Sequence, residues 1–137
     1  MTSEIEKAYD EIYVYTMGRP GFILQHVVDA HTAQKVTVDS KPIAIVFALV
    51  GLYLHLEKGF AGRPVQQAHE RLGRQKRPWP AIALPDDRGA ITALDVMAVP
   101  PGTERDAAID RWCASVWQAF AGSRDAIVRL LAEEGIS

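Results

Sequence analysis

A nearly continuous apolar run from Ile43 to Leu56 constrains the fold more strongly than any other part of the sequence. Pro42 stands at its start, where a missing backbone donor does no harm, and Gly59 follows where glycine commonly ends a helix. These signals predict a helix over 42–58. Because almost every face of this helix is apolar, we expect the rest of the chain to surround it. With 14 residues the run is too short for a membrane-spanning helix, which needs roughly 20, so we expect no membrane association.

Further helices are predicted on both sides of this segment from apolar residues at helical spacing. They run from about 3 to 16, from the break at 18–21 to about 35, from 62 to near 73, from 103 to about 121, and from 123 to just before 135. Ser3, Ser40 and Ser123 are the expected N-caps of three of these helices. The expected fold is an all-α bundle of about five helices around the 42–58 helix. Its length of 137 residues suits one domain, 1–137.

The segment 77–101 is predicted to leave the bundle and lie across one of its ends. Three prolines between 77 and 85 favour an extended chain, and residues 86–89 carry a turn signal. Residues 90–99 fit a short strand, a helical turn or an ordered loop. The spacing of Thr92 and Asp95 is that of a helix cap, so we favour a loop with a single helical turn.

Charge and cysteine content exclude several functional classes. Fifteen basic and seventeen acidic residues give a net charge of −2, which supplies no positive field for nucleic acid, so we expect no nucleic-acid partner. Cys113 is the single cysteine and forms no internal disulfide. The N-terminal region is acidic, unlike the start of a signal peptide. The expected location is the cytoplasm.

Common cofactor and metal motifs are absent from the sequence. It has no glycine-rich phosphate loop, no Cys-x-x-Cys, no His-Glu-x-x-His and no Gly-x-Ser-x-Gly. A metal would also need ligands from several helices, with His55, Glu57 and His69 as candidates, and His26 and His31 are poorly spaced to chelate as a pair. We therefore assign no metal and no cofactor.

Polar residues crowd the otherwise apolar second helix, and His26 and Asp29 are the best placed for chemistry. Asp29 follows His26 by about one helical turn, within side-chain reach. A carboxylate held against a histidine fixes its tautomer and raises its basicity, as a general base requires. We assign both as candidate catalytic residues. The structural alternative, a buried histidine satisfied by its neighbours, is the commoner situation, so whether the protein is an enzyme stays open.

A small-molecule pocket between the second helix and the 42–58 helix is the leading functional hypothesis. Besides His26, the residues expected to contact the ligand are His31, Gln34, Tyr53 and His55, with Trp79 as a cover. The rival hypothesis is a homodimeric interaction protein without such a site, in which the polar residues only satisfy one another. One strip of the 42–58 helix has mainly small side chains, which suits close helix packing more often than a cavity: Ala44, Ala48, Gly51 and His55.

Four stretches follow one another in a recognisable order: QHVVDAHTAQ at 25–34, VGLYLHLEKG at 50–59, ITALDV at 91–96, and the helix from Trp112 to Trp117. In this order they resemble a bacterial family of small helical proteins catalogued as a domain of unknown function. The resemblance covers roughly residues 22–131. It implies a helical fold and an intracellular bacterial origin, and it names no substrate.

The family is in turn similar to helical bundles of the DinB type, in which histidines bind metal. Typical members carry histidines where this chain has Lys35, Ala48 and the Ser123-Arg124 pair. The resemblance therefore implies that this chain keeps only His26 of such a ligand set. Metal chemistry is less expected here than in the family as a whole.

Overall fold

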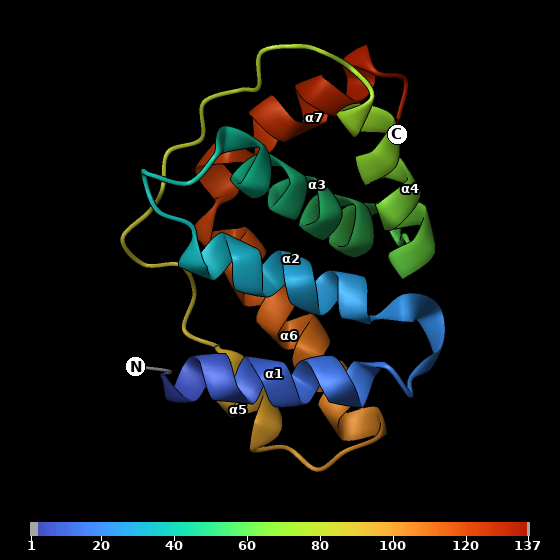
Figure 1. Ribbon diagram of the computed structural model, residues 1–137, viewed down its shortest axis with the longest axis vertical. Helices are drawn as coiled ribbons and strands as arrows, with labels where there is room; N and C mark the ends of the chain where they lie inside the picture. The colour runs from blue at the N-terminus through green and yellow to red at the C-terminus, as the bar shows by residue number, and fades with distance from the viewer. Residues whose placement is uncertain (1–2, 137) are drawn as a thin grey trace.

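The computed structural model describes residues 3–136. Within that range the chain forms seven α-helices and no strand (Figure 1). The helices are α1 (Glu4–Thr16), α2 (Leu24–Lys35), α3 (Pro42–Lys58), α4 (Gly62–Gly73), α5 (Ala93–Met97), α6 (Thr103–Ala119) and α7 (Arg124–Glu133). Two 3-10 turns, η1 (Pro20–Phe22) and η2 (Ala121–Ser123), lie between them. The prediction of an all-α fold is confirmed, but the predicted count of about five helices is too low.

The long apolar helix α3 begins and ends close to the predicted positions. Pro42 is its first residue, and Gly59 ends it in the left-handed conformation with a φ of 72°. The prediction that Ser40 caps the helix is wrong, because the residue before a proline is held extended and Lys41 therefore becomes the N-cap. The Ser40 hydroxyl instead accepts a hydrogen bond from the Thr37 amide at 3.0 Å. No helix within residues 3–136 combines the length and the apolar character needed to cross a membrane.

The helices form two groups that α2 and α6 connect (Figure 1). In one group α3 packs against α2, α4, α6 and α7. In the other, α1 and α5 pack against each other, with α2 beside α1 and α6 beside α5. The expectation of a bundle arranged around α3 therefore needs correction, because α1 and α5 pack mainly on α2, α6 and each other.

Helices α2 and α3 run antiparallel and touch along the predicted strip of small side chains. His26 of α2 stacks on His55 of α3, and Asp29 of α2 lies against Gly51 of α3. The strip thus serves close helix packing, the commoner of the two explanations offered by the sequence. This packing fills the space in which a pocket between α2 and α3 was expected.

The segment between α4 and α5 is irregular, as its prolines predict. Two arginines hold it to the helices. Arg77 pairs with Glu133 and Glu134 at the end of α7. Arg88 donates hydrogen bonds to carbonyl groups at the end of α2, among them Ala33 at 3.2 Å. The helical turn expected within 90–99 is confirmed as α5, with Thr92 and Asp95 forming a capping box.

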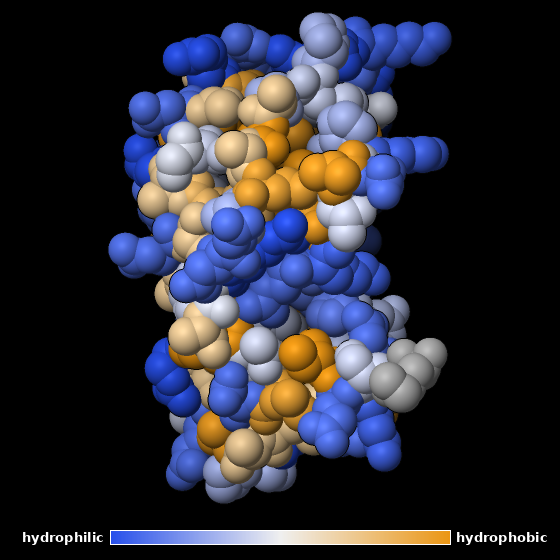
Figure 2. Space-filling model, turned by 90° about the vertical axis from the view of Figure 1, so that its left-hand side faces the viewer, coloured by the Kyte–Doolittle hydropathy of each residue, from blue (hydrophilic) through white to orange (hydrophobic). Residues whose placement is uncertain are grey.

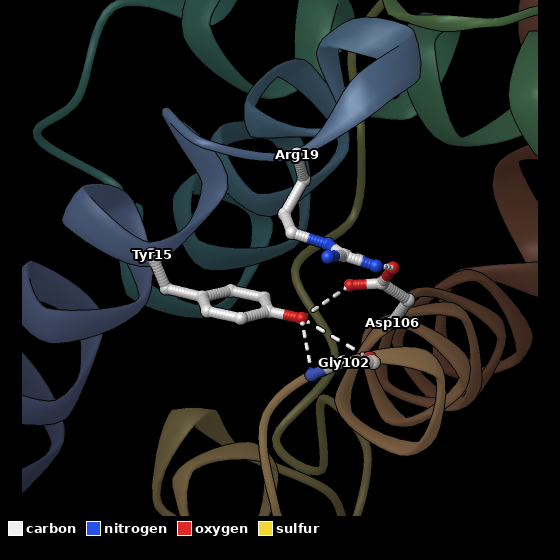
Figure 3. A network of polar contacts seen from close by, with 4 residues as sticks. All are labelled: Tyr15, Arg19, Gly102 and Asp106. Atoms are coloured by element: carbon white, nitrogen blue, oxygen red, sulfur yellow. Dashed lines mark hydrogen bonds and ion pairs between the residues drawn. The ribbon is translucent and has the colours of Figure 1, made fainter.

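A polar network fastens the end of α1 to the start of α6 (Figure 3). The Tyr15 hydroxyl donates to Oδ1 of Asp106 at 2.6 Å and accepts from the Gly102 amide at 3.0 Å. Arg19 donates to Oδ2 of Asp106 through Nε at 3.1 Å and Nη2 at 2.6 Å. These contacts fix the chain at the turn between α1 and α2, next to the 3-10 turn η1.

Candidate functional site

A cavity of about 370 Å³ lies where α1, the end of α2 and the 86–92 segment meet. Figure 2 faces the side of the molecule on which these segments lie, and it shows a polar band between two apolar patches. The volume falls within the range of small-molecule sites. The lining residues are Ser3, Ile5, Glu6, His31, Gln34, Lys35, Asp86, Arg88 and Thr92.

His31 is the buried titratable group of this cavity. Its side chain is only 3% exposed, and its ring stacks on Tyr9 with 3.7 Å between the centroids. Neither ring nitrogen has a hydrogen-bond partner within residues 3–136, although Nε2 lies 3.4 Å from a carboxylate oxygen of Glu6. Burial lowers the pKa of His31 below its ordinary value of 6.5, and Glu6 opposes that shift. The ring is therefore neutral at pH 7.

Gln34 lines the same cavity, but its polar atoms are already in use. Its Oε1 accepts a hydrogen bond from the Trp112 indole at 2.9 Å, and its Nε2 donates to the Ile91 carbonyl at 2.8 Å. Gln34 therefore joins α2 to α6 and to the segment before α5. At the cavity, Gln34 holds the 86–92 segment in place, as Arg88 also does.

His26 lies one and a half helical turns away from His31, in contact with α3 instead of the cavity. It is 2% exposed and stacks on His55 with 3.5 Å between centroids and 14° between planes. Burial, together with His55, lowers the pKa of His26 to about 4. His55 in turn places Nε2 2.9 Å from Asp110 and Nδ1 3.2 Å from the Phe60 carbonyl.

Asp29 does not form the predicted pair with His26. Its Oδ1 accepts a hydrogen bond from Gln25 at 3.1 Å, while Oδ2 has no partner within residues 3–136. Burial raises the pKa of Asp29 well above its ordinary value of 3.8, which favours the protonated form of the carboxyl. The two side chains contact α3 about one turn apart: His26 stacks on His55, and Asp29 lies against Gly51. These contacts replace the predicted contact between His26 and Asp29.

Tyr53 and Trp79 also lie away from the His31 cavity. Tyr53 is buried next to Trp117 of α6, with 6.0 Å between ring centroids. Trp79 packs edge-on against Phe47 of α3 at 5.5 Å and lines a separate cavity beside α7. Of the seven candidate site residues, the structure therefore brings His31 and Gln34 to one cavity, pairs His26 with His55, and places Asp29, Tyr53 and Trp79 elsewhere.

The residues considered as metal ligands are engaged in other contacts. Glu57 accepts hydrogen bonds from Arg124 and from the Trp117 indole, and His69 contacts the Phe47 carbonyl at 2.8 Å. Within residues 3–136, no group of three or more His, Cys, Asp or Glu side chains is arranged to hold a metal ion.

Sequence reasoning missed most of the residues that line the cavity, and Glu6 and Arg88 are the two that matter most for its chemistry and its wall. Glu6 has the spacing of a helix-capping residue relative to Ser3, and the Glu6 amide does donate to the Ser3 hydroxyl at 3.1 Å. That local role gives no sign of a contact with His31, 25 positions further on. Arg88 belongs to the predicted turn at 86–89. Its partners at the end of α2 depend on the path of the whole 77–92 segment, which the sequence pattern does not reveal.

The fold and this cavity define a small all-helical protein with a buried, neutral histidine at a polar cavity. The chain belongs to a family of unknown function (DUF5946), whose model matches residues 6–121. The matched range includes the described cavity residues from Glu6 to Thr92. No curated protein and no solved structure matches this chain.

Proposed function

We propose that the protein binds a small polar molecule in the cavity between α1, α2 and the 86–92 segment, with His31 as its principal contact. The observation that supports this most directly is a buried imidazole that borders a cavity of about 370 Å³ and whose ring nitrogens have no hydrogen-bond partner within residues 3–136. A buried polar group without a partner is unfavourable by about 1–3 kcal/mol, and a ligand that supplies the partner recovers that energy.

The contacts of His31 suit it to exchange a proton with such a ligand. Tyr9 fixes the plane of the ring, and Glu6 lies on the Nε2 side. The neutral imidazole can carry its proton on Nε2, facing Glu6, which leaves the lone pair of Nδ1 without a partner within residues 3–136. Acid–base catalysis is therefore the enzymatic extension of the binding proposal, and it assigns to His31 and Glu6 the roles that the sequence suggested for His26 and Asp29.

A thermal-shift screen of polar metabolites tests the proposal when wild type is compared with His31→Phe. Phenylalanine keeps the stacking on Tyr9 and removes both nitrogens, so a ligand of this site should raise the melting temperature of wild type and not of the variant. His69→Phe is the matched control, because His69 also stacks on an aromatic ring, Phe47, but lies outside this cavity. Equal shifts in wild type and His31→Phe would place the ligand elsewhere and reject the proposed contact.

The alternative is a homodimeric interaction protein, and exposed apolar residues on α1 favour it. Val14 is 67% exposed and Tyr13 37% exposed, next to each other on the outer face of that helix. Sedimentation over a range of concentrations tests this alternative. A dimer that Val14→Asp dissociates, together with no ligand for the cavity, would favour the interaction protein.

The resemblance to DinB-type bundles, the bacterial origin and the cytoplasmic location belong to the same proposal. They rest on the ordered sequence pattern from 25 to 117 and on the absence of a disulfide-forming cysteine pair in the sequence. Superposition of an experimental structure on DinB-type bundles tests the first of these.

A further inference from the structure

The turn between α1 and α2 borders a second cavity, of about 560 Å³, on the opposite end of α1 from the His31 cavity. Its walls come from the end of α1, the 3-10 turn η1, the start of α2 and the start of α4. Met17, Phe22 and Leu24 contribute apolar surface, and Met17 is 67% exposed. A ligand there would meet both apolar and charged side chains.

The charged lining residues of this cavity are both arginines, Arg19 and Arg63. The charge of Arg19 is neutralised by Asp106, to which two of its nitrogens donate hydrogen bonds (Figure 3). Arg63 has no carboxylate partner within residues 3–136; one of its nitrogens donates to the Gln66 amide oxygen at 2.9 Å. Arg63 is exposed, so its guanidinium brings to the cavity a positive charge that no carboxylate within residues 3–136 neutralises.

The residues next to Arg63 are closely packed. Its guanidinium lies over the Phe22 ring, 4.0 Å from the centroid. Phe22 itself has a φ of 51°, and Gly62 packs so tightly on the Phe22 carbonyl that an added Cβ would lie 1.9 Å from that oxygen. A wall built this way loses little freedom when a ligand binds, which favours binding.

We propose that this second cavity binds an organic anion, with its carboxylate on Arg63 and its apolar body against Met17, Phe22 and Leu24. Charge-assisted hydrogen bonds from a guanidinium to a carboxylate are about twice as strong as neutral ones, and a planar guanidinium suits a planar acid. The site is independent of the His31 cavity, so either proposal can fail without the other.

Three probes with the same phenyl ring test the charge preference: phenylacetate, phenylacetamide and phenethylamine. Each is titrated to about 10 mM into the ¹⁵N-labelled protein, a range that detects millimolar binding. We expect phenylacetate to shift the Gly21 and Gly62 amides and the Arg63 Nε–H, with about tenfold tighter binding than phenylacetamide, and phenethylamine to leave them unchanged. Arg63→Gln should reduce phenylacetate binding to the level of phenylacetamide.

Arg74→Gln is the matched control, since it removes one exposed arginine of α4's C-terminal cap and lies outside the cavity. It should leave phenylacetate binding unchanged. Equal binding of the three probes by wild type would overturn the proposal without any variant. Full binding of phenylacetate by Arg63→Gln would overturn it too, as would the absence of any shift at the highest concentration.

Discussion

The carboxyl group of Asp29 lies in the space that a side chain at position 51 would need: its Oδ2 is 1.8 Å from the place where a Cβ on Gly51 would stand. This contact fixes how closely α2 and α3 approach. The Oδ2 atom of this carboxyl has no partner within residues 3–136, and it faces the backbone of α3 where no side chain stands. Burial favours the protonated form of Asp29 at this interface.

Replacing Gly51 with alanine should destabilise the protein. The new methyl group meets the buried Asp29 carboxyl, and overpacking of this kind typically lowers the free energy of unfolding by about 1–3 kcal/mol. Urea unfolding measures the change. Gly122→Ala is the control, because nothing lies within 4 Å of a Cβ at that position. In a protein that already carries Asp29→Ala, the space is free, so Gly51→Ala should lower the free energy of unfolding by less. An equal loss in both backgrounds would show that the methyl group clashes with an atom other than those of the Asp29 carboxyl.

Asp29→Asn should become more stabilising, relative to wild type, as the pH rises. The pKa of Asp29 is raised in the folded state, so its contribution to stability is complete below the ordinary value of 3.8 and is lost as the pH rises towards the folded-state pKa. Asparagine has nearly the same shape and does not titrate. Unfolding free energies of both proteins at several pH values between 4 and 8 give the difference. A difference that does not change with pH would show that Asp29 ionises normally.

His26→Phe should remove an acid sensitivity of the wild type. The pKa of His26 falls from 6.5 to about 4 on folding, so its contribution to stability is complete above 6.5 and is lost as the pH falls through that range. The difference corresponds to about 3 kcal/mol. Phenylalanine retains the stacking on His55. Wild type should therefore lose stability relative to the variant between pH 7 and 4, as measured by urea unfolding; parallel pH profiles would contradict a buried, neutral His26.

Arg88→Ala should loosen the segment that forms one wall of the His31 cavity. Arg88 donates to the carbonyls of Ala33, Gln34 and Val36 at the end of α2, and their loss should lower the free energy of unfolding by about 2 kcal/mol. Amide exchange should accelerate in residues 81–91 more than in α3. Arg129→Ala, on α7, is the comparison variant and should leave exchange in 81–91 unchanged. Equal exchange of that segment in Arg88→Ala and wild type would show that Arg88 is not needed to hold it.

Tyr15→Phe should weaken the connection between α1 and α6. The substitution removes a donor to Asp106 and an acceptor for the Gly102 amide, at an expected loss of about 1–2 kcal/mol (Figure 3). Tyr13→Phe is the control, since the Tyr13 ring is exposed on the same helix. Thermal or urea unfolding distinguishes the two. If both variants lose the same amount, the Tyr15 hydroxyl has no special part in the network.

The sequence by itself determined the helical class, the position of α3 and the caps of α5. These features rest on short-range physics. An apolar run of 14 residues between a proline and a glycine is too long for a typical strand and favours a helix, and the Thr92–Asp95 spacing closes a capping box within four residues. The small strip of α3 also indicated close packing before its partner was known, because a small residue admits a neighbouring backbone whichever helix supplies it.

The tertiary structure alone decided which side chains meet. His26 and Asp29 are neighbours in sequence, and each nevertheless finds its contact on α3, since two antiparallel helices present successive turns to successive partners. His31 gains Tyr9 and Glu6 from α1, and the loop residue Arg88 reaches the end of the same helix. Such contacts join residues 22 to 55 positions apart. They depend on how whole helices pack, which periodicity and capping do not encode.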